Sequence, residues 1–374
     1  VGIDETFGLE SAIDYNTDPL PTGIPPLDHA LGGGVGRGRF AELFGTWSSG
    51  KSLILALLLA VNQKVGGKGL MGDTEGSFDG EFFRTLGGDP DKLKMIPDKY
   101  ATTVEGMFGF ISDLADMVLK DPEWSSVPIL VGWDGIANSA TKHLLKEGME
   151  KRDMSKALSM SQGMQLITNK IRNTRIAVVT TNQTRDTIGT YDSATHTPGG
   201  QSYKFGCSQR VEFVYDGGSK GSLILHEEDK EKFEIGRRVV AYVRKNKMAS
   251  PFGQCRLFCY TIPGFPHPVY ERKTRVGIDA EQTLFDYYLH GRFFINDMER
   301  VVSHDGAGWY SVHPEYAPGE AKFREKDFPE KLEKFPILKT LLYEALEIDP
   351  ETYLPKSRKA TTAPTTKKKK AKAE

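Results

Sequence analysis

The chain has 374 residues, of which 39% are hydrophobic, and its formal net charge is −1. This length and composition predict one large α/β domain with appendages and exclude a wholly disordered chain. The sequence has no apolar run of about eighteen residues, so no membrane span is predicted. It has no charged-then-apolar leader, so no secretory signal is predicted. With so little net charge, any binding of nucleic acid must come from a local basic patch.

The cysteine content indicates the redox compartment of the protein. Cys207, Cys255 and Cys259 are odd in number and show no metal-type pairing with histidines. We therefore expect reduced thiols in a cytosolic protein. The chain starts at Val1 rather than at Met, so the sequence does not identify the native N-terminus.

Strands and helices alternate through the first half of the chain. We expect strands at residues 39–44, 68–73, 128–134 and 176–181. We expect helices at residues 22–34, where glycines end the helix, and at 53–61, 80–86, 104–119 and 155–172, and a glycine loop at 45–52. This alternation predicts a mostly parallel sheet with helices on both faces. Ligands then bind at the carboxyl ends of the strands.

The pattern changes after residue 183. Residues 184–203 lack periodicity, which is typical of a functional or mobile loop. Four short strands and then a small helical C-terminal region follow, at residues 210–215, 222–226, 237–244, 256–261 and 280–348. We expect an N-terminal segment, a core, a small C-terminal domain and a disordered basic tail, at residues 1–21, 22–270, 271–355 and 356–374.

The glycine loop fits the phosphate-loop pattern of Gly, four residues, Gly, Lys and Ser. Its expected nucleotide-binding residues are Gly45, Thr46, Trp47, Ser48, Ser49, Gly50, Lys51 and Ser52. The glycines let backbone N–H groups approach phosphate oxygens, Lys51 supplies a cation, and Ser52 supplies a hydroxyl ligand for Mg²⁺. A chance glycine turn is the alternative, but the strand before the loop and the helix after it favour a phosphate site.

Polar residues end three of the other predicted strands. Asp134 suits the carboxylate that holds Mg²⁺ beside a phosphate loop, although many buried strands end in an acid that only caps a helix. Glu75 is a candidate for activating the attacking water, and a solvated turn acid is an equal alternative. Gln183 opens the 184–203 loop directly and is a candidate sensor of the γ-phosphate.

A basic run follows the strand at 237–244. Lys245 and Lys247 are two residues apart on an extended segment, so they share one face and can meet a phosphate together. A solvated charged face is the plain alternative for such a run.

Taken together, these residues resemble the RecA family of recombinases from about residue 22 to residue 265. The shared order is Thr22-Gly23, Leu27-Asp28, Ala30-Leu31-Gly32, the loop 45–52, Asp73-Thr74-Glu75, Asp134, Met160-Ser161-Gln162, Asn182-Gln183, Gly199-Gly200, Lys204-Phe205 and Lys245-Asn246-Lys247 through Pro251-Phe252. The mid-size chain and short N-terminus are also similar to the phage UvsX-like branch.

The resemblance implies a RecA-like ATPase core that uses ATP and Mg²⁺ to form a helical filament on single-stranded DNA. The filament would pair that strand with duplex DNA and exchange strands, with single-strand-binding and mediator proteins as possible partners and no membrane. It would work in the cytoplasm of a bacterial cell or a phage-infected host.

The resemblance also assigns roles to individual residues. Glu75 would activate water, and Gln183 would couple the γ-phosphate to a second DNA loop at 184–203, the first DNA loop being at 139–155. Lys245 and Lys247 would act at the neighbouring subunit's ATP. The remaining implied sites are the adenine contacts Asp79 and Phe82, the DNA contacts Arg185, Ile188, Gly189, Gly199, Gly200 and Gln201, and the subunit contacts Lys204 and Phe205.

The chain also departs from the family pattern. Trp47 is unusual within a phosphate loop, and Leu158 and Gln165 stand where arginines would help to bind DNA phosphates. The tail is basic rather than acidic, which should attract DNA. Phe7 is the best aromatic candidate for an N-terminal contact between protomers.

Two other functions share this core. A hexameric replicative helicase would present an arginine finger and carry a separate N-terminal domain, whereas this chain has Lys245 and Lys247 at that position and little room before residue 22. A non-catalytic, ATP-regulated recombination mediator would not need Glu75 and Asp134.

Overall fold

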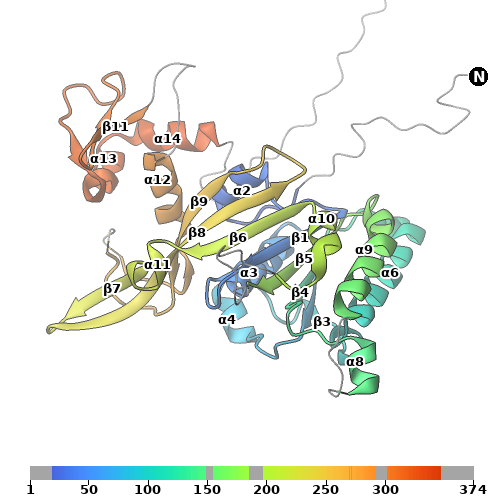
Figure 1. The fold of residues 1–374 in the computed structure, drawn as a ribbon. Helices are drawn as coiled ribbons and strands as arrows, with labels where there is room; N and C mark the ends of the chain where they lie inside the picture. The colour runs from blue at the N-terminus through green and yellow to red at the C-terminus, as the bar shows by residue number, and fades with distance from the viewer. Residues whose placement is uncertain are drawn as a thin grey trace, which may run out of the picture.

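The computed structural model describes residues 19–148, 155–184, 197–268, 270, 272–290 and 301–346. Within these residues, a ten-stranded sheet forms the centre of the molecule (Figure 1). Its strand order is β10 (Gly277–Ile278), β9 (Gln254–Tyr260), β8 (Glu231–Asn246), β6 (Gln209–Tyr215), β1 (Arg39–Gly45), β5 (Ile176–Gln183), β4 (Ile129–Asp134), β2 (Lys68–Asp73) and β3 (Leu93–Met95), with β7 (Leu223–Glu228) paired to β8.

The sheet has a parallel half and an antiparallel half. From β6 through β1, β5, β4 and β2 to β3 every pairing is parallel, which confirms the prediction for the first half of the chain. The later strands pair antiparallel, as β6 with β8, β8 with β9 and β9 with β10. The β7–β8 hairpin projects from the body of the molecule (Figure 1).

Helices cover both faces of the parallel half, as predicted. On one face lie α2 (Pro25–Leu31), α3 (Lys51–Lys64) and α4 (Gly80–Thr85), and on the other lie α6 (Val104–Lys120), α9 (Ser155–Ile171) and α10 (Gly200–Gly206). Strand residues alternate between the two cores, so that Leu130 of β4 packs on the α3 face and Trp133 on the α9 face. None of the helices in the described ranges combines the length and apolar character needed to cross a bilayer.

Five short helices were not predicted, namely α5 (Asp98–Ala101), α7 (Pro122–Ser125), α8 (Lys142–Glu147), α10 and α11 (Gly218–Gly221). None of them is longer than seven residues, and α10 begins at Gly200, inside the stretch at 184–203 that was predicted to be a loop. Helices this short do not complete an apolar stripe, so the sequence carries little periodic signal for them.

The prediction of a helical C-terminal region was wrong in part. Between α12 (Ala280–His290) and the last helices, the chain forms a three-stranded antiparallel sheet of β11 (Val302–Gly306), β12 (Trp309–Val312) and β13 (Phe323–Arg324). The short 3-10 helix η1 (Glu325–Asp327) follows, and then α13 (Phe328–Lys334) and α14 (Pro336–Ala345). These strands have two to five residues, too few for alternation to show.

The C-terminal elements share a core of their own, which includes Leu284, Tyr310, Phe323 and Leu342. This separate core agrees with a small C-terminal unit, while its boundaries at 271 and 355 stay a prediction. The tail at 356–374, and Phe7 in the N-terminal segment, lie outside the described residues.

One carboxyl group is buried where the chain enters the core. Asp28 of α2 is 2% exposed, and its Oδ1 accepts a hydrogen bond from the backbone N–H of Thr22 at 2.6 Å. Its Oδ2 is buried without a hydrogen-bond partner among the described residues. Burial raises the pKa of Asp28 to about 8, although the Thr22 hydrogen bond lowers it.

This burial predicts a pH-dependent stability. Folded Asp28 keeps its proton up to a pKa of about 8, and in the unfolded chain it ionises near its ordinary value of 3.8. Because the folded state then binds one more proton, this group should lower the free energy of unfolding by about 1.4 kcal/mol per pH unit as the pH rises between these values. Denaturant unfolding of Asp28→Asn should show a shallower fall from pH 5 to pH 8, with the exposed Asp113→Asn as control. An unchanged slope in Asp28→Asn would contradict the assignment.

Candidate nucleotide site

The glycine loop takes the conformation that its spacing predicts. Gly45 ends β1 with φ +150°, and a Cβ there would lie 2.2 Å from the carbonyl oxygen of Phe213. Gly50 has φ +88° and stands directly before α3, which starts at Lys51. A side chain would clash at Gly45, and at Gly50 the backbone has a left-handed conformation that residues with a side chain rarely adopt. The loop therefore runs into the N-terminus of a 14-residue helix, where free N–H groups favour an anion.

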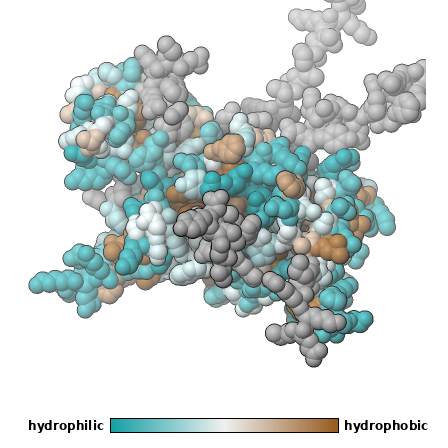
Figure 2. Space-filling model, in the orientation of Figure 1, coloured by the Kyte–Doolittle hydropathy of each residue, from teal (hydrophilic) through white to brown (hydrophobic). Residues whose placement is uncertain are grey.

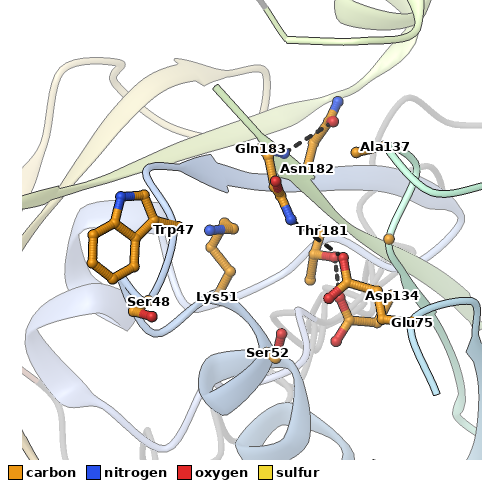
Figure 3. A pocket seen from close by; sticks show the side chains of 11 residues that line it. Trp47, Ser48, Lys51, Ser52, Glu75, Asp134, Ala137, Thr181, Asn182 and Gln183 are labelled. Carbon is orange, nitrogen blue, oxygen red and sulfur yellow. Dashed lines mark hydrogen bonds between the residues drawn. The ribbon is translucent and has the colours of Figure 1, made fainter. Parts of the chain in front are cut away.

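Lys51 lies at the floor of the cavity that follows the loop (Figure 3). Its Nζ donates to the carbonyl oxygen of Thr46 at 2.6 Å and lies 3.4 Å from the Ser49 hydroxyl. Burial lowers the pKa of Lys51, and the negative charges of Asp134 and Glu75 act in the opposite direction. The loop thus holds a partly desolvated cation that faces two carboxylates.

Asp134 and Ser52 line the same cavity as Lys51. Asp134 ends β4, is 3% exposed, and accepts a hydrogen bond from the hydroxyl of Thr181 on β5. A carboxylate and a hydroxyl are hard oxygen donors of the kind that Mg²⁺ takes beside a nucleotide. The chemistry of the two side chains is compatible with a magnesium ion, and their role as its ligands stays a prediction.

A turn after β2 holds Glu75 beside Asp134 in the lining of the cavity (Figure 3). Asp73, the last residue of β2, accepts hydrogen bonds from the N–H groups of Glu75, Gly76 and Phe78 at 3.0, 2.9 and 2.8 Å. Thr74 ties this turn to β4, because its N–H donates to the carbonyl oxygen of Asp134 at 2.7 Å. Sequence reasoning treated Asp73 only as a strand end, although an acid two residues before a turn glutamate is an Asx-turn signal.

Glu75 and Gln183 meet across the cavity. Gln183, the last residue of β5, points its Nε2 at Glu75 Oε1 over 3.4 Å (Figure 3). Burial raises the pKa of Glu75, Asp134 raises it further, and Lys51 opposes both. A carboxylate whose pKa is raised toward neutrality is better suited to take a proton from water.

Trp47 stands at the rim of the cavity and is 68% exposed. Its ring lies edge-on to that of Tyr215, with centroids 6.4 Å apart, and the Tyr215 hydroxyl donates to the Trp47 carbonyl oxygen at 2.8 Å. Asp79 and Phe82 do not line this cavity. Asp79 caps α4 through the N–H groups of Glu81 and Phe82, so an adenine role for this pair stays a prediction.

Lys245 and Lys247 lie away from the cavity, on the other face of the sheet. A bulge in β8 pairs Arg210 with Lys245 and Val211 with Val243, so Arg244 is the extra residue. The bulge reverses the alternation and turns Lys245 toward α10. There Lys245 Nζ donates to the carbonyl oxygens of Lys204 and Phe205 at 2.9 and 2.7 Å.

The two lysines share one face, as their spacing predicts. Lys247 Nζ reaches the Phe205 carbonyl oxygen at 3.4 Å, and the Phe205 ring is 70% exposed beside Lys245. Burial lowers the pKa of Lys245, and the charge of Lys247 lowers it further. Lys204 also lies here, and burial and Arg210 lower its pKa. This lysine face is a concentration of positive charge that an anion would relieve.

A buried ion pair that sequence reasoning missed lies between the cavity and the lysine face. Glu42 of β1 is 0% exposed and binds both the Arg210 guanidinium and the Asn182 amide. Asn182 Nδ2 also donates to the Pro198 carbonyl oxygen at 2.9 Å, and Arg210 reaches the Thr197 hydroxyl at 3.4 Å. Glu42 thus anchors the point where the 184–203 loop returns to the core.

The structure describes part of each predicted DNA loop. Gly199 and Gly200, with φ +105° and +79°, begin α10, and Gln201 follows them on its exposed side. Arg185, Ile188 and Gly189 lie outside the described residues, as do residues 149–154 of the first loop. On α9, Leu158 is 59% exposed and Gln165 is also exposed. The DNA-contact roles therefore stay predictions.

Comparison with known proteins gives a consistent result. Residues 2–262 match the family model described as the RecA N-terminal domain. The chain is 33% identical over 264 residues to Protein RecA of Oleidesulfovibrio alaskensis, covering 68% of this chain and 70% of that protein. It is 33% identical to Protein RecA of Rhodopirellula baltica, covering 67% of this chain and 64% of that protein. Over a longer match it is 28% identical to Protein RecA of Tropheryma whipplei, covering 87% of this chain and 67% of that protein.

The electrostatics of the cavity predict how the pKa of Glu75 responds to its neighbours. Because Lys51 lowers this pKa and Asp134 raises it, Lys51→Ala should raise the pKa of Glu75 and Asp134→Asn should lower it. The measurement is a ¹³C NMR titration of the Glu75 carboxyl carbon, with the exposed Lys220→Ala as control. Shifts in the same direction in both cavity variants would exclude this charge arrangement.

Proposed function

The chain belongs to the RecA family, and on that premise we propose that it is an ATP-dependent recombinase. It assembles as a helical filament on single-stranded DNA, pairs that strand with homologous duplex DNA and exchanges strands. One observation carries the proposal: a single cavity gathers the phosphate-loop cation Lys51, the hard ligands Ser52 and Asp134, and the Glu75–Gln183 pair.

The roles of the cavity residues follow from their positions. The loop N–H groups and Lys51 hold the triphosphate, and Ser52 and Asp134 hold Mg²⁺, which neutralises charge on the phosphates when it is bound. Glu75 accepts a proton from the water that attacks the γ-phosphate. Gln183 donates to Glu75 and opens the 184–203 loop, so it can couple the state of the nucleotide to DNA binding.

The lysine face completes the nucleotide site of the next subunit in this proposal. Lys245 Nζ binds carbonyl oxygens of α10, which packs with α9 on the face opposite to α3 and the phosphate loop. By its register Lys245 is also level with Glu42, roughly 10 Å along β1 before Gly45. Lys245 and Lys247 therefore act on ATP held by another copy, with Phe205 and Lys204 in the same contact. Nucleotide state then controls assembly, and hydrolysis releases DNA.

The helicase and mediator alternatives are less well supported by this geometry. The exposed arginine at the end of β8, Arg244, is paired with Glu212 at 2.6 Å within the same chain, whereas an arginine finger would reach the neighbouring subunit. Glu75 and Asp134 both line the cavity, where turnover would use them and a non-catalytic mediator would not need them. Membership of the UvsX-like branch stays a prediction, as do the single-strand-binding and mediator partners. We place the action in the cytoplasm, where DNA and ATP are both available.

The proposal is tested by measuring ATP hydrolysis with and without single-stranded DNA, together with strand exchange between homologous substrates. DNA should stimulate hydrolysis, and Glu75→Gln should slow turnover by roughly 10²- to 10⁴-fold with ATP binding retained, because only proton transfer is lost. Glu123→Gln, an exposed glutamate on α7, is the matched control. If DNA leaves hydrolysis unchanged, or if Glu75→Gln turns over normally, the proposal is wrong.

The lysine face makes a second prediction. Lys245→Ala should lower DNA-stimulated hydrolysis by roughly 10²-fold, because it removes a cation that acts only across the subunit junction. ATP binding by dilute, DNA-free protein should be unaffected, since Lys245 does not line the chain's own cavity. Lys220→Ala, on an exposed helix end, controls for loss of charge. Equal loss in the dilute protein and in the assembled protein would argue against a role between subunits.

A further inference from the structure

Three large apolar side chains are more exposed than any others in the described part of the chain. Phe252 is 79% exposed, Phe205 is 70% exposed and Trp47 is 68% exposed. The view in Figure 2 shows a mostly hydrophilic surface on which apolar residues form small, separate patches. Scattered apolar residues need no explanation, but Trp47 lies at the rim of the nucleotide cavity, Phe205 lies on the lysine face, and Phe252 lies in the turn that follows the two lysines along the chain.

Tyr215 supports Trp47 at the rim of the cavity. The carbonyl oxygen of Trp47 is held by the Tyr215 hydroxyl, and the Trp47 ring stands edge-on to the Tyr215 ring at 86°. The Arg237 guanidinium lies over the Tyr215 ring, 5.0 Å from its centroid, so the support of Trp47 is itself packed. A supported aromatic ring with most of its surface exposed loses little freedom when a partner covers it.

Backbone hydrogen bonds hold the turn that carries Phe252. Phe252 lies in the turn between β8 and β9, five residues after Lys247, and has φ +71°. Its N–H donates to the Val243 carbonyl oxygen at 3.0 Å, and the Val243 N–H donates to the Gly253 carbonyl oxygen at 2.8 Å. A bulky residue in this left-handed conformation is uncommon, and here the turn displays its ring to solvent.

Phe205 contacts the two lysines of its own chain. Its carbonyl oxygen binds the ammonium groups of both Lys245 and Lys247, and its ring lies 5.9 Å from Lys245 Nζ. Phe205 is therefore tied to the lysines, whereas Phe252 lies in the turn that follows them. Of these two phenyl rings near the end of β8, that of Phe252 is the more exposed.

We propose that Phe252 of one copy packs on Trp47 of the next copy and closes the rim of its nucleotide cavity. The inference rests on the proposed function, which brings the lysine face of one subunit to the phosphate loop of another. Charge supports the same pairing, because the cavity carries the carboxylates of Glu75 and Asp134 and the opposing face carries Lys245 and Lys247. Within one chain, the two aromatic residues lie at opposite ends of the sheet, since Trp47 follows β1 and the Phe252 turn adjoins the start of β1 and β6.

The contact would make the second copy part of the nucleotide site. Two aromatic rings in contact bury a large apolar area and prefer an offset or edge-on geometry. Closure of the rim would exclude water around the phosphates, which strengthens the charge interactions inside the cavity. It would also give a role to a tryptophan that is unusual in a phosphate loop.

The test is a cross-link between two single variants, Trp47→Cys and Phe252→Cys, mixed in equal amounts and treated with a short bis-maleimide. The three native thiols are buried, and burial raises the pKa of Cys207 and Cys259 to about 12, so they should react slowly. With single-stranded DNA and a slowly hydrolysed ATP analogue, cross-linked dimer should rise roughly tenfold or more, because assembly raises the effective concentration of the pair.

The controls separate this inference from the proposed function. Leu225→Cys, at an exposed apolar position on the β7–β8 hairpin, replaces Phe252→Cys as the matched control and should give no such dimer. Sedimentation of the same mixtures reports assembly. If the mixture assembles on DNA without the Trp47–Phe252 dimer, the inference is wrong and the proposed function stands. If no mixture, and no wild-type protein, assembles with DNA and nucleotide, the proposed function fails and the inference fails with it.

Discussion

Parallel strands that end at one edge of the sheet bring together the loop, the turn and the strand ends that carry the charged groups of the nucleotide cavity. In the register of the sheet, Gly45 is opposite Gln183 and Asp73 is opposite Asp134. Because successive strand residues alternate between faces, a shift of one residue in any pairing would turn a carboxylate or amide away from Lys51. The two apolar cores that fix this register therefore also fix the charges.

The same alternation separates two polar networks that share strand β5. Thr181 faces the cavity and binds Asp134, while its neighbour Asn182 faces the other way and binds buried Glu42. Asn182 also holds the return of the 184–203 loop. One strand end thus touches both the nucleotide cavity and the anchor of the expected DNA-binding loop, which is a short physical route for coupling the two.

The molecule has two faces of different chemistry, which the proposed function brings together in neighbouring copies. The cavity face has a partly desolvated cation, two carboxylates and an exposed indole ring. The lysine face has ammonium groups gathered at a helix end beside the exposed ring of Phe205. Head-to-tail contact between such faces repeats from copy to copy, and it forms a ring where the rotation closes and a helical filament where it does not, so it is compatible with the proposed filament.

Local sequence patterns determined the phosphate loop, the order of strands and helices, and the polar residues at the strand ends, because each depends on residues close together in the chain. Gly45 and Gly50 can be identified from the sequence in this way, because residues with a side chain rarely adopt their backbone angles. Only the tertiary structure decided that Thr181 binds Asp134, that Glu42 pairs with Arg210, and that a bulge at Arg244 turns Lys245 to the far face. These contacts join residues 47 to 168 positions apart, or depend on the register between strands, and no local pattern encodes either.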